Sequence, residues 1–204
     1  MTKAGDFGKP EALAKSIEFV KSLGGMFPIY SKETTVKTFM LSILSVLMFT
    51  CNALALQPGD LAPSFSLKDN QGKSFTLGDH VGKDGKGDTK GLILGFFAPQ
   101  CKPCRHELSV LNSLVDGFKA QGIQVAIVGY YEDFNQIMKY LAEIHVDKPI
   151  ILSDKDGKVS AAYGVHFLPA TFFISFDGKV KEIMRGESPH IERALQQNAA
   201  ELLK

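Results

Sequence analysis

Apolar residues in the second half of the chain follow two patterns. Residues 92–97 and 123–131 form continuous apolar runs, which are typical of strands buried on both faces of a sheet. Residues 103–121 and 133–145 instead carry apolar side chains at helical spacing. Gly122 indicates the end of the first helix, and Asp133 is suited to cap the start of the second.

Shorter elements complete this alternation of strands and helices. Turn residues predict an N-terminal hairpin about 70–72 and a second hairpin about Asp177-Gly178. A short strand over 149–154 and a short helix near Tyr163 lie between them, and Ser188 is expected to cap a last helix. Residues 80–91 are rich in glycine and lysine and predict an exposed loop. Together, these elements predict an α/β fold with a central mixed sheet flanked by helices.

The N-terminal region does not belong to this domain. Residues 38–59 carry no charge, and the apolar core over 39–49 follows Lys32 and Lys37. Ala53 and Ala55 form the small-x-small pattern of a signal-peptidase site. The apolar core is shorter than the roughly 20 residues of a membrane span, which favours a cleaved export signal over 35–55. An uncleaved membrane anchor through 38–56 is the alternative.

Two further features of this region carry no assigned function. Cys51 raises the question of lipidation, but Met48, Phe49 and Thr50 before it are bulkier than a lipoprotein signal normally tolerates. Residues 1–34 are either a cytosolic extension of an anchor or the product of a start codon placed too far upstream. The folded domain is therefore expected over 56–204.

Composition narrows the classes of function for this domain. The chain has 204 residues, of which 45% are apolar and 22% are charged, as expected for one globular domain. Its formal net charge of +1 gives no sign of a nucleic-acid partner. Three cysteines are too few for a disulfide scaffold, and export would leave only Cys101 and Cys104 in the mature chain.

Cys101 and Cys104 form a CxxC pair between a buried strand and a helix. At a helix N-terminus, unpaired N–H groups and the helix dipole favour a thiolate, and Lys102 and Arg105 add positive charge. Cys101 is then the nucleophile, and Cys104, one turn further in, resolves the mixed disulfide. A structural disulfide would close too short a loop to stabilise the chain much.

A metal site is the third interpretation of this pair. Zinc would need four ligands, and no second cysteine pair exists in the mature chain. Copper would recruit a histidine, for which His166 is the candidate. We therefore expect no metal and no cofactor beyond the cysteine pair.

The sequence around this pair resembles the TlpA/ResA-like thioredoxins, a family of extracytoplasmic thiol–disulfide oxidoreductases. The resemblance rests on "GFFAPQCKPCRHEL", on "PGDLAPSFSLKDNQGKSFTL" before it and on "DKDGKVSAAYGVHFLPATFFISFDGKV" after it, and covers nearly all of 58–186. It implies a thioredoxin fold with an N-terminal β-hairpin and a helix–strand insertion over 131–154.

The resemblance also implies roles for single residues. It makes Cys101 and Cys104 the redox disulfide and Glu107 the acidic residue near the second cysteine, although an exposed carboxylate on the helix surface is the alternative. It implies a cis bond at Pro169 facing the cysteines, and pairing of the Leu168 backbone with the client. The remaining candidates for client binding are Gln100 and Pro103 beside the cysteines. Tyr130 and Tyr131 at a strand end are candidates to line the site.

One departure concerns the residues next to the nucleophile. The family normally carries tryptophans there, whereas this chain has Phe97 and Gln100 and no tryptophan at all. With Gln100 in place of a tryptophan, the Cys101 sulfur is less shielded from solvent and its surroundings are more polar. The departure affects the expected redox potential and partner preference rather than the exchange chemistry.

The expected function is disulfide exchange with client proteins in the periplasm or another extracytoplasmic compartment. The resemblance implies a reductase, for example in cytochrome c maturation, that is recharged by a membrane electron donor. A copper-binding or redox-sensing module that uses the same cysteines is the alternative. A peroxiredoxin is disfavoured, because its peroxidatic cysteine follows a P-x-x-x-[ST]-x-x-C pattern, whereas Pro99 stands two residues before Cys101.

The export interpretation predicts that the mature protein begins near Leu56, because Ala53 and Ala55 precede it at the positions that signal peptidase requires. Intact mass or N-terminal sequencing of the exported protein measures this directly. Recovery of the full-length chain alone, in the membrane pellet, would replace the cleaved signal by an anchor.

Overall fold

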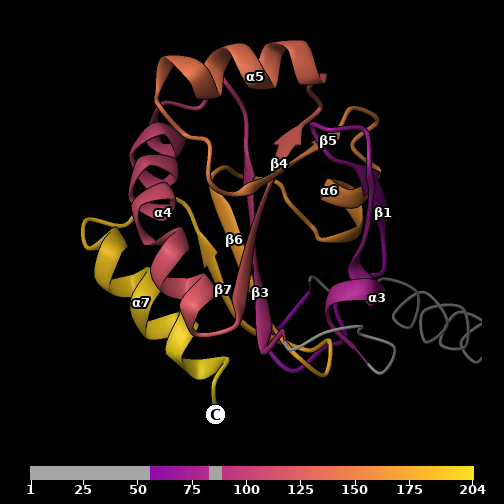
Figure 1. Cartoon of the computed structure of the whole chain (residues 1–204), viewed down its shortest axis with the longest axis vertical. Helices are drawn as coiled ribbons and strands as arrows, with labels where there is room; N and C mark the ends of the chain where they lie inside the picture. The colour runs from indigo at the N-terminus through magenta and orange to yellow at the C-terminus, as the bar shows by residue number, and fades with distance from the viewer. Residues whose placement is uncertain (1–55, 83–88) are drawn as a thin grey trace, which may run out of the picture. The chain divides into compact units, whose positions relative to one another are not determined.

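The computed structural model describes residues 56–82 and 89–204, which form the fold in Figure 1. The predictions for 1–34 and 35–55 lie outside the described residues. Among the residues that are described, no helix is long and apolar enough to cross a membrane.

A five-stranded mixed sheet forms the centre of the domain, in the order β5-β4-β3-β6-β7. The central strand β3 pairs in parallel with β4 and antiparallel with β6, while β5 and β7 occupy the two edges. The expected central mixed sheet is confirmed. The strands are β3 (Gly91–Phe97), β4 (Ile123–Tyr130), β5 (Ile150–Asp154), β6 (Ala170–Ser175) and β7 (Val180–Arg185).

Helices cover both faces of this sheet. The long helix α4 (Lys102–Ala120) packs beside α7 (Ile191–Glu201) on one side, and α3 (Leu77–His80) and α6 (Lys158–Ala162) lie on the other side with the hairpin (Figure 1). The hairpin consists of β1 (Ser66–Lys68) and β2 (Ser74–Thr76). Helix α5 (Phe134–Glu143) begins as predicted, since the Asp133 carboxylate accepts the N–H groups of Asn135 and Gln136 at 3.0 and 3.2 Å.

The pleat of β3 divides the hydrophobic core into two layers. Leu92, Leu94 and Phe96 pack with the hairpin and α6, whereas Ile93 and Phe97 pack with α4 and α7. All seven residues of β3 are buried, which explains its continuous apolar sequence. The strand therefore ends inside the domain, and the CxxC segment starts where β3 leaves the sheet.

Two details of the predicted elements were wrong. The last helix begins at Ile191 with His190 as its N-cap, whereas Ser188 was expected to cap it. The Ser188 hydroxyl instead accepts the N–H of His190 at 3.4 Å, a local turn that ends before the helix starts. The segment over 80–91 was expected to be exposed, yet Val81 is buried in the core and His80 stacks on Phe75. Residues 83–88 of that segment lie outside the described residues.

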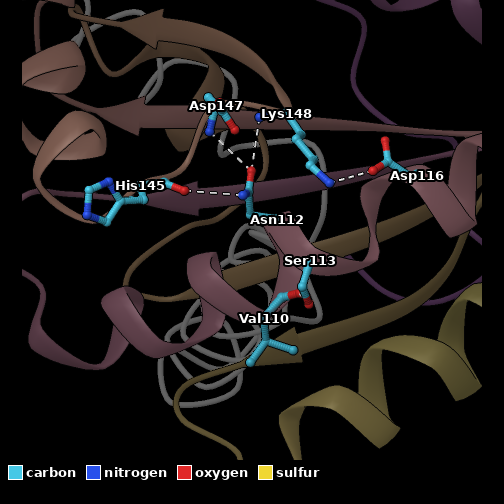
Figure 2. A network of polar contacts seen from close by, with 7 residues as sticks. All are labelled: Val110, Asn112, Ser113, Asp116, His145, Asp147 and Lys148. Carbon is cyan, nitrogen blue, oxygen red and sulfur yellow. Dashed lines mark hydrogen bonds and ion pairs between the residues drawn. The ribbon is translucent and has the colours of Figure 1, made fainter.

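A polar network on α4 holds the connection between α5 and β5 (Figure 2). The Asn112 side chain donates to the carbonyl oxygen of His145 at 3.2 Å and accepts the N–H groups of Asp147 and Lys148 at 3.1 and 2.9 Å. The Lys148 ammonium also pairs with Asp116, one turn further along α4. Because one side chain satisfies three backbone groups of this connection, the residues after α5 keep a defined position against α4.

Candidate active site

Cys101 and Cys104 lie at the N-terminus of α4 and form a disulfide with an S–S distance of 2.02 Å and a Cα–Cα distance of 5.4 Å. Cys101 is the N-cap of the helix, and its sulfur accepts the N–H of Cys104 at 3.3 Å. Cys104 is completely buried, while Cys101 remains partly exposed. The two sulfurs therefore differ in access, as the position of the pair on the helix predicted.

The Glu107 side chain points from α4 into the core, one turn after Cys104. It is only 6% exposed, and the hydroxyl of Thr171 on β6 donates to its Oε1 atom at 2.5 Å. Among the residues that the structure describes, its Oε2 atom has no hydrogen-bond partner. The alternative of an exposed carboxylate on the helix surface is thus wrong. Gly95 on β3 borders the Glu107–Thr171 pair, since a Cβ atom there would lie 3.4 Å from the Thr171 hydroxyl oxygen.

Burial raises the pKa of Glu107, and this effect exceeds the opposing effects of the Thr171 hydrogen bond and of nearby His106. A carboxyl group with a raised pKa is a stronger base once it is ionised. Its affinity for a proton therefore moves toward that of a thiol, whose ordinary pKa is about 8.5. This arrangement suits proton transfer with a buried thiol on the same side of the helix.

The loop before β6 approaches the cysteines from the other side. The Leu168–Pro169 bond is cis, as the resemblance implied, and Pro169 is buried. Ala170, the next residue, pairs with Phe96, close to the end of β3 from which the CxxC segment emerges. Phe167, for which the sequence predicted no role, is 76% exposed beside it. The available signal in the sequence was an aromatic residue two positions before Pro169.

The other predicted site residues lie near the ends of β3 and β4. Gln100 is exposed, and Pro103 lies in the first turn of α4, where its missing N–H costs nothing. Tyr130 packs partly into the core layer on the hairpin side, and Tyr131 is 56% exposed with a positive φ of 54°.

The ring of Tyr131 occupies the space above Gly157, where a Cβ atom would lie 2.0 Å from its Cζ atom. Because β4 runs parallel to β3, both tyrosines lie at the same end of the sheet as the cysteines. His166 is exposed. Within 56–82 and 89–204, no three His, Cys, Asp or Glu side chains form a cluster that would hold a metal.

A helix that starts with a CxxC disulfide after a central strand, opposite a cis proline on the antiparallel neighbour, defines a class of protein. It is the thiol–disulfide oxidoreductase with a thioredoxin fold, in which the exposed cysteine exchanges disulfides and the buried one resolves them. Glu107 and Thr171 add a buried, hydrogen-bonded carboxyl–hydroxyl pair to that arrangement.

Comparison with known proteins agrees with this class. The AhpC/TSA family model matches residues 58–183. The chain is 33% identical over 153 residues to the thiol-disulfide oxidoreductase ResA of Geobacillus thermodenitrificans, covering 72% of this chain and 83% of that one. It is also 33% identical to ResA of Bacillus subtilis over 132 residues, which cover 65% of this chain and 69% of that protein.

A solved structure gives the same picture. A protein from Chlorobium tepidum described as a thiol:disulfide interchange protein DsbE is 31% identical and superposes with a TM-score of 0.64, covering 73% of this chain and 99% of that chain. The chain therefore belongs to the AhpC/TSA family, within its ResA-like thiol–disulfide oxidoreductases.

The buried carboxyl group of Glu107 makes stability depend on pH. The pKa of Glu107 is higher in the folded protein than in the unfolded chain. The contribution of this group to the free energy of unfolding is therefore complete at low pH and is lost as the pH rises through the folded pKa. Glu107→Gln, which stays neutral, should therefore raise the melting temperature relative to wild type more at pH 8 than at pH 4. Thermal unfolding of the oxidised proteins across this range measures the difference. Glu143→Gln, at an exposed carboxylate near the end of α5, is the control and should show no such trend.

Proposed function

We propose that this protein reduces disulfides of client proteins outside the cytosol. The Cys101 thiolate attacks one sulfur of a client disulfide, that S–S bond breaks, and the departing client thiolate takes up a proton. Cys104 then loses its proton and attacks the Cys101 sulfur of the mixed disulfide. The second client thiolate leaves, the Cys101–Cys104 disulfide forms, and two electrons have passed to the client.

The unequal exposure of the two sulfurs carries this proposal. Cys101 is accessible at the N-terminus of α4, where backbone N–H groups and the helix dipole stabilise a thiolate, whereas Cys104 is wholly buried. A client can therefore reach one sulfur and not the other. A structural disulfide or a symmetric metal site would not require this difference in exposure.

In this proposal Glu107 accepts the proton that Cys104 must lose before it can attack. Cys104 and Glu107 are one turn apart on the buried side of α4, and the carboxyl group is shielded from water. The Thr171 hydroxyl holds one carboxyl oxygen, which leaves the other oxygen open to a proton. The Cys104 proton can then pass directly to the Glu107 carboxyl group within the core, so no water molecule is needed to carry it.

The client chain lies across the disulfide next to the cis-proline loop. The backbone of Leu168 pairs with it, and buried Pro169 fixes the loop at the end of β3. Exposed Gln100 and the first-turn Pro103 contact the client from the side of the CxxC segment. The exposed ring of Phe167 adds apolar area on the same side.

The direction of electron flow follows from the relatives in this proposal. Proteins named ResA and DsbE resemble the chain over most of its folded part, and the resemblance stated from the sequence is to extracytoplasmic reductases. A reductase in an oxidising compartment needs a supply of electrons, for which we propose a membrane dithiol donor. Cytochrome c maturation is the process that we propose for its clients.

Glu107→Gln is expected to slow resolution by about 10²-fold while leaving the first attack nearly unchanged, because the amide cannot accept the Cys104 proton. A model disulfide that releases a coloured thiol in each step separates the two phases in stopped-flow measurements from pH 6 to pH 9. Glu187→Gln, at an exposed carboxylate between β7 and α7, controls for the loss of a negative charge away from the cysteines. Equal slowing of both phases, or none, would remove Glu107 from the mechanism.

Cys104→Ser is expected to accumulate mixed disulfides with client proteins, because the first attack still occurs and no second thiol releases the product. Cys101→Ser should trap little, since Cys104 is buried. Each variant is expressed in an exporting host, quenched with acid, alkylated and resolved on a non-reducing gel.

The same experiment separates the proposed enzyme from the alternatives. A structural disulfide gives no client adduct with either variant. A copper or sensing site makes both variants lose the ion alike, which the copper-to-protein ratio of the reduced protein measures. Equal adduct levels from the two variants would contradict the exchange mechanism.

A further inference from the structure

A groove of about 500 Å³ runs along the exposed side of α4, beginning at Lys102, the residue that follows Cys101. Its α4 wall is formed by residues that alternate with the buried ones, and its other wall is the end of α5 and the connection that follows. The side chains that matter to its chemistry are Lys102, Arg105, His106 and Ser109 on α4, and Glu143 and His145 opposite.

The second wall of this groove is held in a defined position. His145 adopts a positive φ of 56° directly after the C-cap of α5, and its carbonyl oxygen accepts the side-chain N–H of Asn112 (Figure 2). The N–H groups of the next two residues donate to the same side chain. The groove is therefore part of the folded framework, and its shape does not depend on a partner being bound.

The charges in this groove are unbalanced. Within the described residues, neither Lys102 nor Arg105 forms an ion pair, and both are exposed. Glu143 is the one carboxylate among the residues that line the groove, against two permanent cations and two imidazoles. The formal net charge of +1 for the whole chain conceals this local excess.

We propose that this groove binds an acidic segment of the client polypeptide, next to the client's disulfide. The inference rests on the proposed function, because the occupant must present a disulfide to Cys101. The unpaired cations on the α4 wall favour carboxylates, and Arg105 can hold one of them in a bidentate pair. Clients with acidic residues near the reactive cysteine are therefore selected over neutral ones.

The dimensions of the helix and of an extended chain locate those acidic residues. From Cys101 to Arg105 the helix advances one turn, or about 6 Å. An extended client chain advances about 3.3 Å per residue. A carboxylate two or three residues from the client cysteine thus comes opposite Lys102 and Arg105, while the rest of the segment remains beside the cis-proline loop.

The test compares two peptide disulfides that differ only in having Glu or Gln at the second and third positions on both sides of the cysteine. For the wild-type reductase, kcat/KM should be higher for the Glu peptide, and added salt should remove the difference. Lys102→Gln and Arg105→Gln should each lower this preference about two- to fivefold. The Gln peptide reports any change in the reactivity of Cys101 itself, so only the ratio counts.

Lys119→Gln is the matched control, because it removes one charge from an exposed residue of the same helix about 25 Å away. It should leave the preference unchanged. Equal rates for the two peptides in the wild type, or an equal loss of preference in Lys119→Gln, would overturn the groove as the acidic-segment site. Reduction of neither peptide by the wild type would overturn the proposed function, and this inference with it.

Discussion

The position of β3 at the centre of the sheet is the constraint on which the site depends. This strand is buried on both faces and is paired along its length with β4 on one side and with β6 on the other. Its end therefore determines where α4 begins and which part of β6 lies opposite. The disulfide, the cis proline and the buried carboxyl group meet there because all three are attached to elements that adjoin the end of β3.

Burying Glu107 carries a cost that the fold offsets only in part. One oxygen receives the Thr171 hydroxyl, while the other has no partner among the described residues, and desolvation raises the pKa of the group. In our proposal, the carboxyl group is retained in the core for its chemistry rather than for stability. In the proposed mechanism this same desolvation makes it a suitable base for the Cys104 thiol, so the cost and the function have one origin.

Client selection in this proposal depends on electrostatics at short range. The whole chain is nearly neutral, yet Lys102 and Arg105 stand without ion-pair partners in the described structure beside the reactive disulfide. The same two charges that favour the Cys101 thiolate therefore also face the client. The Asn112 network contributes by holding the opposite wall, although it touches neither cysteine (Figure 2).

The sequence by itself determined the elements of the fold and the place of the chemistry. The continuous run of β3 and the helical spacing after Pro103 are local patterns, so they placed Cys101 and Cys104 at a helix N-terminus without reference to distant residues. Local signals were weaker at the ends of elements. There Ser188 formed a turn in place of a helix cap, and Val81 was drawn into the core from a segment of polar composition.

Tertiary structure alone decided the surroundings of the cysteines. The buried carboxyl group of Glu107 accepts its hydrogen bond from Thr171, which is 64 positions away in the sequence. The groove depends on Asn112 meeting a backbone 33 to 36 positions later. Such contacts follow from the pairing of β3 with β6 and from the packing of α4 against the connection after α5. Hydrophobic periodicity reports which face of an element is buried, and it does not report which distant side chain that face will meet.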